Sequence, residues 1–277
     1  DLTVASQASL TPALARPEAI ARWTRLGGAW HLAIDTGMSR AGVRWDEIAM
    51  LRDLIAAHPP EGAFTHFHSA DRNDGSAELQ ERRFCNAVAT LPVRPKLLHA
   101  ENGPAITRRH GSSWDLVRPG VFLYGVGSGV GAELRAGVVV HVRARVVDLR
   151  TVRDGETVSY SATYRAVGDR RIATLPIGYA DGYRYALGNR GTALLHGTRV
   201  PIAGLVTMDM TMLDVTGVPC EVGDVVTLIG RDGDDLLEVE TVAREAELSP
   251  YELLTGLRGR LERIYHELPP LTEAARA

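Results

Sequence analysis

The segment HLAIDTGMSR, residues 31–40, decides the fold class of this chain. It opens on a short run of apolar residues, His31 to Asp35, and changes abruptly to Thr36-Gly37. Such a run, bounded by polar residues and glycine, predicts a buried β-strand whose carboxyl end carries polar side chains. Residues 63–68 and 97–101 repeat this pattern, and they end in His66-Phe67-His68 and in His99 with Glu101-Asn102-Gly103. We therefore expect neighbouring strands of one parallel sheet.

Strand-like runs alternate with amphipathic stretches throughout the first half of the chain. The predicted strands are residues 2–5, 31–35, 63–68, 97–101 and 120–126. Between them, residues 17–26, 46–58 and 76–91 space their apolar side chains three and four positions apart, which predicts helices. This alternation is typical of repeated βα units around a parallel sheet.

Five βα units are too few to close a barrel. A (β/α)8 barrel takes about 250 residues, and five parallel strands alone leave two unpaired edges. We therefore expect residues 1–134 to form the larger part of a (β/α)8 TIM-type barrel, with its N-terminal units missing from this chain. In such a barrel the active site lies at the carboxyl ends of the strands.

From residue 135 onward the pattern changes to that of antiparallel strands. Apolar and charged residues alternate at 142–146, and later runs at 172–177, 200–212 and 225–229 are bounded by Gly, Asp and Pro. Residues 239–257 have a helical pattern that is interrupted at Ser249-Pro250, where the serine can cap the helix carrying Tyr251. These patterns predict a C-terminal, mostly antiparallel β domain at 135–277.

Composition narrows the classes of partner. The 277 residues are 45% hydrophobic and 23% charged, with a formal net charge of -3. No basic cluster favours nucleic acid, and no apolar run approaches the roughly 20 residues that cross a bilayer. We expect a folded cytoplasmic protein with no nucleic-acid or membrane partner. Cys85 and Cys220 are too few and too far apart for a disulfide framework, and no metal-ligand cluster is apparent.

Seven motifs occur in the order and spacing of the alanine racemase family. They are HLAIDTGMSR at 31–40, THFHSAD at 65–71, HAEN at 99–102, VRPG at 117–120 with LYG at 123–125, VSY at 158–160, PIGYADG at 176–182 and Met208-Asp209. The chain thus resembles this family over nearly its whole length. The resemblance implies a racemase that depends on pyridoxal 5'-phosphate, interconverts L- and D-alanine and supplies D-alanine for peptidoglycan. It also implies a homodimer whose active site is shared between the subunits.

The resemblance assigns three catalytic residues. Tyr160 corresponds to the tyrosine that reaches the partner's barrel and exchanges a proton on one face of the substrate α-carbon. A phenol can do this only where neighbouring cations favour its ionised form. Arg118 corresponds to the arginine that donates to the pyridine nitrogen of the cofactor, and His66 to the histidine that links this arginine to the tyrosine.

The family's binding residues can also be placed on the chain. The cofactor contacts implied are those of Arg118, of Asn102 and Gly103, of the backbone at Gly120 and Val121, and of the Tyr251 hydroxyl. Arg40, Met208, Asp209 and Tyr179 correspond to residues that meet the substrate or line its entry route. Gly120 lets the main chain approach a phosphate closely.

The chain departs from the family pattern at several positions. Lys96 is its only lysine and precedes a predicted strand, so the Schiff-base lysine of the family is not present in this chain. Ala33 stands where many members carry a carbamylated lysine beside the arginine matched by Arg40, and a chloride is expected to fill that gap. Gly103 replaces a phosphate-binding serine. Leu205 and Tyr185 stand where arginines usually line the entry corridor.

Two alternatives remain open at this point. The changes at Leu205 and Tyr185 could broaden the substrate range, which would make the protein a broader-specificity amino-acid racemase. The absent lysine, with Ala33 and Gly103, could instead mark a non-catalytic paralogue that binds pyridoxal phosphate.

Overall fold

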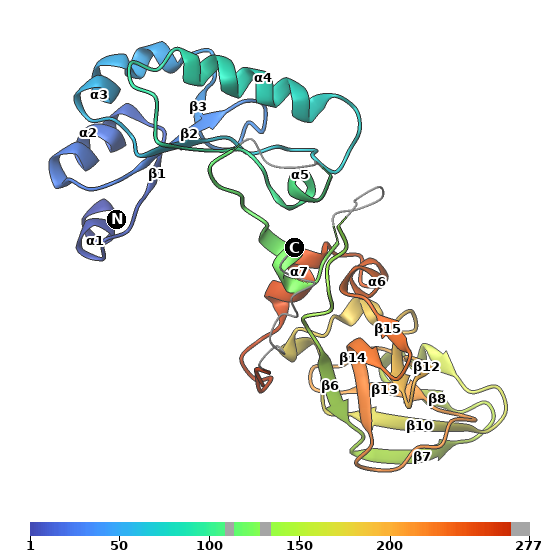
Figure 1. Ribbon diagram of the computed structural model, residues 1–277. Coiled ribbons are helices and arrows are strands. Elements are labelled where there is room, and N and C mark those ends of the chain that lie inside the picture. Colours follow the sequence, from blue (N-terminus) through green and yellow to red (C-terminus); the bar gives the residue numbers. More distant parts are fainter. Residues whose placement is uncertain (109–113, 128–133, 267–277) are drawn as a thin grey trace. The chain divides into compact units, whose positions relative to one another are not determined.

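A computed structural model describes residues 1–108, 114–127 and 134–266 of the chain. The chain divides into two compact units, Asp1–Gly137 and Val138–Ala277 (Figure 1). Each unit has a core of its own and a different type of sheet.

The first unit is built on a five-stranded sheet in which every strand pair is parallel. Its strands are β1 (Ala13–Leu14), β2 (His31–Asp35), β3 (Val43–Arg44), β4 (Gly62–Phe64) and β5 (Leu97–His99). The register aligns Ala33 with Phe64, and Phe64 with His99. The carboxyl ends of β2, β4 and β5 therefore lie side by side at one edge of the sheet.

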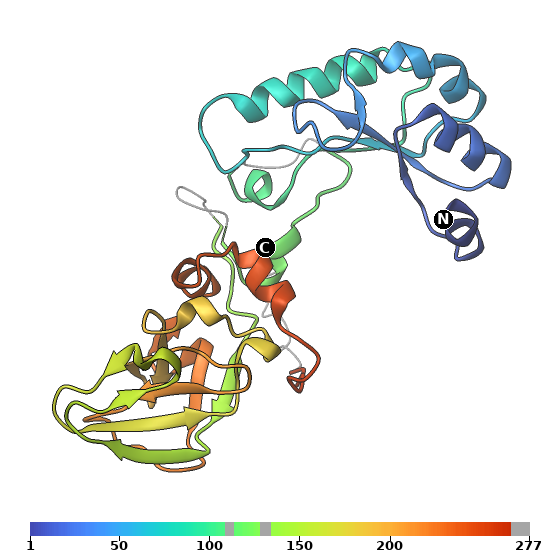
Figure 2. The same ribbon diagram turned by 180° about the vertical axis from the view of Figure 1, so that it is seen from behind.

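Helices cover this sheet. They are α1 (Leu2–Gln7), α2 (Pro17–Leu26), η1 (Ile48–Leu51), α3 (Arg52–Ala57), α4 (Ser76–Ala89) and α5 (Gly103–Arg108). Both α3 and α4 lie along the same side of the sheet (Figures 1 and 2). Buried side chains of α2 and α4, such as Trp23 and Phe84, share a core cluster with Leu32 and Leu98 of the strands. Burial of such side chains stabilises this unit by roughly 1.5–3 kcal/mol each before entropy is subtracted.

The strand predicted at residues 2–5 is wrong, because these residues belong to helix α1. The Asp1 carboxylate accepts a hydrogen bond from the backbone N–H of Thr3 at 2.9 Å and so caps the helix. Leu2 and Ala5, three positions apart, both pack against the core. A cap and a helical spacing of apolar residues outweigh the β preference of the local sequence.

The strand predicted at residues 120–126 is also wrong, because Gly120–Tyr124 forms the 3-10 helix η2. Gly120 has a φ of 57°, in the left-handed region, and Pro119 has no N–H to donate to a neighbouring strand. Among the residues that the structure describes, the strand-type pairing nearby is an isolated parallel bridge between Asn102 and Arg118. By contrast, the strand predicted at 31–35 and the helix predicted at 17–26 are confirmed.

The second unit is built from antiparallel strands. The strands are β6 (Val142–Arg145), β7 (Asp148–Val152), β8 (Thr157–Val158), β9 (Tyr164–Arg165), β10 (Arg170–Leu175), β11 (Thr192–Leu195), β12 (Thr198–Pro201), β13 (Thr211–Asp214), β14 (Val225–Asp232) and β15 (Asp235–Leu237). One sheet has the order β13-β10-β7, a second has the order β12-β11-β14-β15 with β6 also paired to β14, and β8 pairs with β9. The predicted antiparallel character of this half of the chain is confirmed.

Two helices, α6 (Val239–Glu245) and α7 (Pro250–Gly256), lie at one end of this β-rich unit (Figure 1). The Ser249 side chain accepts from the backbone N–H of Glu252, whose carboxylate accepts in return from the Ser249 N–H, and Pro250 is the first helical residue. The predicted break and cap at Ser249-Pro250 are confirmed. No helix in the described part of the chain is long and apolar enough to cross a membrane.

Candidate active site

A buried glutamine of α4 is hydrogen-bonded to residues at the strand ends of the first unit. Gln80 is 1% exposed, and its side-chain amide donates to the Thr36 hydroxyl and to the His66 carbonyl, both at 3.1 Å. Its amide oxygen accepts from the backbone N–H of His68 at 3.0 Å. The Thr36 and Thr65 hydroxyls are 2.6 Å apart. Gln80 thus fixes the carboxyl end of β2 to the segment that follows β4.

Arg118 lies at this edge, beside the end of β5. Its Nη2 donates to the carbonyls of Thr65 at 2.7 Å and Ala100 at 3.2 Å, and its Nη1 donates to Nδ1 of His99 at 2.5 Å. Its guanidinium also lies over the ring of Phe64, 5.3 Å from the ring centre. Three of its five N–H groups are therefore engaged by described residues, while Nε–H and one Nη1–H remain available to an acceptor.

Burial and neighbouring charge keep the histidines of this edge neutral. Burial, with the nearby charges of Arg118 and then Arg40, lowers the pKa of His66. Burial, with Arg118 and then His31, lowers the pKa of His99 to about 4. A neutral imidazole can accept a hydrogen bond from a guanidinium, whereas an imidazolium cannot. The site therefore concentrates positive charge on its arginines.

The residues predicted to meet the cofactor's phosphate surround the chain after β5. The Asn102 side chain donates to the Phe67 carbonyl at 3.1 Å. At Gly103 a Cβ atom would lie 2.7 Å from the Pro119 carbonyl oxygen, so the close approach of the two segments requires glycine there. This contact is a physical reason for glycine at a position where the family resemblance implies a serine. At Gly120, which leads into Val121, a Cβ atom would meet no described atom within 4 Å, so the backbone there faces open space.

Ala33 and Arg40 differ in their surroundings. Ala33 is buried in β2, whereas Arg40 is exposed beyond the strand end. The Arg40 charge acts on His66, which places the two side chains in the same electrostatic environment.

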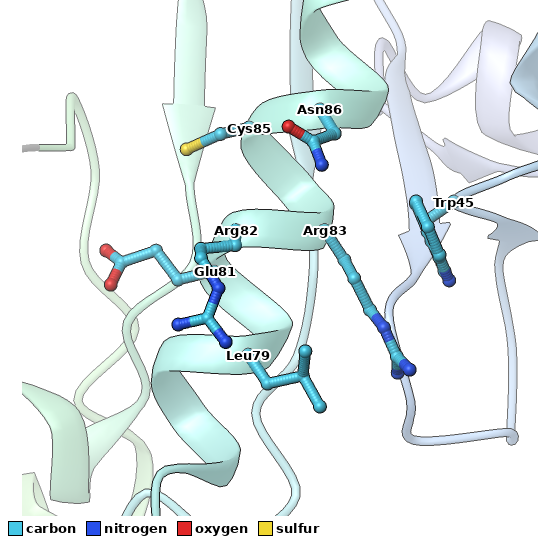
Figure 3. Close-up of a pocket in the computed structure, with 7 residues that line it drawn as sticks. All are labelled: Trp45, Leu79, Glu81, Arg82, Arg83, Cys85 and Asn86. Carbon is cyan, nitrogen blue, oxygen red and sulfur yellow. The ribbon is translucent and has the colours of Figure 1, made fainter.

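A hollow of about 500 Å³ lies elsewhere in the first unit, at the surface of α4 (Figure 3). It is lined by Trp45, Leu79, Glu81, Arg82, Arg83, Cys85 and Asn86. Arg83 points toward Trp45, with its guanidinium carbon 5.5 Å from the ring centre, and donates to the Thr36 carbonyl at 2.9 Å. None of the predicted site residues lines this hollow, so it is not the candidate site.

In the second unit, Tyr160 stands on a strained turn. It begins the short 3-10 segment η3 (Tyr160–Ala162) and is 73% exposed. Ser159, Ser161 and Ala162 have φ values of 67°, 60° and 49°, in the region that L-residues rarely adopt. The Ser159 hydroxyl donates to the Leu205 carbonyl at 2.8 Å. Strain of this kind persists only where the surroundings hold it, and it is common at functional sites.

The segment carrying Met208 and Asp209 is fixed to η4 (Tyr179–Asp181). The N–H groups of Tyr179 and Ala180 donate to the carbonyls of Thr207 and Met208, both at 3.0 Å. Arg260 bridges two carboxylates, with Nε 2.9 Å from the buried Asp181 and Nη1 2.8 Å from Asp209. The side chains of Tyr179 and Met208 remain exposed.

The other predicted residues of the second unit are exposed or partly exposed. Tyr251, in α7, is 56% exposed. Tyr185, in η5 (Tyr185–Leu187), meets the Tyr179 ring edge-on with centres 6.5 Å apart. Leu205 is partly buried beside Gly188.

The predicted site residues therefore form two groups. His66, Arg118, Asn102, Gly103, Gly120, Val121 and Arg40 belong to the first unit, and Tyr160, Tyr179, Met208, Asp209 and Tyr251 belong to the second. Sequence reasoning did not find the roles of Gln80, His99 and Arg260 in holding these groups. For His99 a signal was present, because it begins the HAEN motif at the end of a strand. For Gln80 and Arg260 no local pattern distinguishes them from other polar residues on a helix or loop.

Comparison with known proteins identifies the class to which these two units belong. The families described as the N-terminal and the C-terminal domain of alanine racemase match residues 1–128 and 139–265. An alanine racemase of Sorangium cellulosum is 36% identical over 249 residues, and one of Deinococcus radiodurans is 42% identical over 242 residues. These alignments cover 86% and 84% of this chain and 66% of each relative.

Solved structures agree with this assignment. The crystal structure of alanine racemase from Bartonella henselae with covalently bound pyridoxal phosphate matches with a TM-score of 0.85 at 29% identity, over 95% of this chain and 75% of that one. The predicted fold class, barrel-type βα units followed by a mostly antiparallel β domain, is thereby confirmed. The chain belongs to the alanine racemase family. It spans about two thirds of the length of the curated relatives that it matches.

Proposed function

We propose that this protein is an alanine racemase that uses pyridoxal 5'-phosphate to interconvert L- and D-alanine. One observation carries the proposal: Arg118 is held at the strand ends by His99, Thr65 and Ala100 while two of its N–H groups stay available. A fixed, permanently charged donor of this kind suits the pyridine nitrogen of the cofactor.

The residues of the first unit fit the cofactor on its ring and phosphate sides. Arg118 offers donors to a ring nitrogen, and the open backbone at Gly120 and Val121 can approach a phosphate. The chain's only lysine, Lys96, does not fit the aldehyde side, because it precedes β5 and so lies at the opposite end of that strand from His99. We therefore assign ring and phosphate contacts to this chain and no covalent attachment.

When bound, the cofactor withdraws electrons from the substrate α-carbon and makes its hydrogen acidic. Arg118 would donate a hydrogen bond to the ring nitrogen and disfavour its protonation, which would limit this withdrawal and discourage side reactions. Tyr160 would exchange a proton with one face of the α-carbon. Arg40, with the Met208-Asp209 backbone, would hold the substrate carboxylate, and Tyr179 would line its entry.

Expression from the complete reading frame followed by a chiral assay tests this function. Incubation with pyridoxal phosphate and L-alanine should yield equal amounts of D- and L-alanine, and the same mixture should form from D-alanine. Cofactor binding without any D-alanine would overturn the proposal in favour of a binding protein.

A second candidate, a racemase of broader specificity, is favoured by the exposed aromatic pair of Tyr179 and Tyr185. An uncharged aromatic lining in place of an arginine would admit bulkier apolar side chains. The same chiral assay with L-valine, L-leucine and L-methionine separates the two candidates. Rates within tenfold of the alanine rate would support the broader one.

We also propose that a chloride lies between Ala33 and Arg40. Because Arg40 is exposed in this chain, such an anion would be held only where other groups enclose it. Crystals grown in bromide should give an anomalous peak within contact distance of Arg40. The absence of a peak there at full bromide exchange would remove the anion from the account.

A further inference from the structure

Arg118 is connected to two histidines of the first unit, the buried His99 and, through it, the half-buried His31. Arg118 Nη1 lies 2.5 Å from Nδ1 of His99, and Nε2 of His99 lies 2.9 Å from Nδ1 of His31. Nε2 of His31 then lies 4.0 Å from the carboxylate of Glu61, which is exposed. The four side chains thus follow one another from Arg118, beside the carboxyl end of β5, to Glu61, which directly precedes β4.

The direction of every hydrogen bond in this row is fixed by its first member. A guanidinium can only donate, so Nδ1 of His99 must accept and carries no proton. A neutral His99 then has its proton on Nε2, from which it donates to Nδ1 of His31. His31 in turn must be unprotonated at Nδ1 and carries its proton on Nε2, the atom nearest Glu61.

The neutral state of both rings agrees with their surroundings. Burial lowers the pKa of His31, and Glu61 opposes this in part. His99 is 7% exposed and stacks on the Phe64 ring, with centres 4.9 Å apart and planes 11° apart. Phe64 also underlies Arg118. The aromatic ring therefore excludes water from the contact between Arg118 and His99.

The absence of a side chain at Gly62 provides the space in which the His31 ring lies. His31 and Gly62 are partners in the register of β2 and β4. A Cβ atom at Gly62 would lie 2.5 Å to 2.8 Å from three atoms of the His31 ring, closer than carbon atoms can approach. The imidazole thus lies directly on the backbone of β4. This close contact is possible only with glycine, and it holds the ring in line with His99.

We propose that His31, held against Gly62, is a positioning residue that fixes the tautomer of His99 and thereby the orientation of Arg118. Without an acceptor at His31, the Nε2 proton of His99 has no partner, and the other tautomer, which cannot accept from Arg118, becomes populated. Arg118 would then lose one of the contacts that hold its guanidinium in place. The effect on catalysis rests on the proposed function, whereas the tautomers of His31 and His99 do not.

The test uses the full protein with 15N-labelled histidine and long-range proton–nitrogen NMR. At pH 7 both His31 and His99 should carry their proton on Nε2 alone. His31→Phe removes the acceptor, so the single-tautomer pattern of His99 should be lost. His31→Gln supplies an amide oxygen in its place and should restore that pattern. His196→Gln, an exposed histidine of the second unit, is the control and should leave His99 unchanged.

Two results would overturn the proposal. One is a proton on Nδ1 of His99 in the unsubstituted protein, and the other is an unchanged His99 pattern in His31→Phe. Gly62→Ala provides a second variant, because it displaces the His31 ring without removing it, and it should also disturb His99. In the chiral assay, His31→Phe should lower kcat at unchanged KM, and His31→Gln should recover it. The NMR result stands even if no amino acid is racemised, so the two proposals fail separately.

Discussion

At the scale of single residues, charge in the candidate site is arranged by burial. Arg118 carries the positive charge, and burial together with this charge lowers the pKa of its neighbours His66 and His99. An imidazolium at either position would compete with Arg118 for acceptors and repel it at short range. The two histidines can then support the arginine as uncharged partners.

This arrangement predicts how stability depends on pH. The pKa of His99 is lowered to about 4, so between about pH 6.5 and 4 the unfolded chain binds a proton that the folded chain does not. The free energy of unfolding should therefore fall as the pH drops through this window, with a slope of at most about 1.4 kcal/mol per pH unit from one histidine. Urea unfolding between pH 7 and 4.5 measures it. His99→Asn should give a shallower slope, and His196→Asn is the control. Equal slopes for His99→Asn and the unsubstituted protein would refute the assignment.

The sequence predicts the identity of site residues better than their contacts. Arg118 and His66 follow from motifs, because the order of residue types along the chain carries that information. The contact between Arg118 and His99 does not, since it depends on the pairing of the Arg118 segment with residues 101 and 102 after β5. Arg260 lies far along the chain from Asp181 and Asp209, and no local spacing relates it to either.

At the scale of elements, α4 does more than cover the sheet. Its buried Gln80 is hydrogen-bonded to residues that follow β2 and β4, and these residues lead into the candidate site. The backbone carrying His66 and His68 has no strand partner at these hydrogen bonds, so a side chain takes the place of one. Helix and strand ends are thereby joined at a defined distance.

Replacement of Gln80 should show how much its hydrogen bonds contribute to the free energy of unfolding. Gln80→Leu keeps the approximate volume but leaves the His66 carbonyl and the His68 N–H without their partner. The expected loss is about 1–3 kcal/mol in the free energy of unfolding. Gln7→Leu, at an exposed position of α1, is the matched control and should change stability by less than about 0.5 kcal/mol. A loss of free energy of unfolding no larger than that of the control would show that the Gln80 hydrogen bonds do not contribute to stability.

The sequence predicts an element correctly where a residue pattern along the segment determines it, and fails where a single residue does. The strand β2 and the helix α2 are specified locally, by an apolar run between polar ends and by a regular spacing after Pro17. The helix α1 and the 3-10 helix η2 are specified by single residues, the Asp1 cap and the backbone of Pro119-Gly120. Preferences summed along a segment miss such single-residue effects.

At the scale of the whole molecule, the proposed site residues are divided between two units. Arg118 and His66 belong to the unit with the parallel sheet, and Tyr160 belongs to the antiparallel one. We propose that the protein is a homodimer in which Tyr160 of one subunit serves the cofactor held by the other, as the family resemblance implies. An isologous dimer would then contain two equivalent sites.

Complementation tests this arrangement. Tyr160→Phe and Arg118→Gln should each be nearly inactive as pure proteins. Mixed and allowed to exchange subunits, they should recover about a quarter of the unsubstituted activity, because half of the dimers are mixed and each has one intact site. No recovery after verified subunit exchange would mean that Tyr160 serves its own subunit.

The most direct measurement of the central claim is the exchange of the alanine α-hydrogen in D2O, followed by NMR and chiral separation. The protein expressed from its complete reading frame, and supplied with pyridoxal phosphate, should place deuterium at the α-carbon of both L- and D-alanine. Tyr160→Phe should lose exchange from one enantiomer by about a hundredfold or more while retaining it from the other. Exchange of both enantiomers at the original rate in Tyr160→Phe, or no exchange by the unsubstituted protein, would contradict the account.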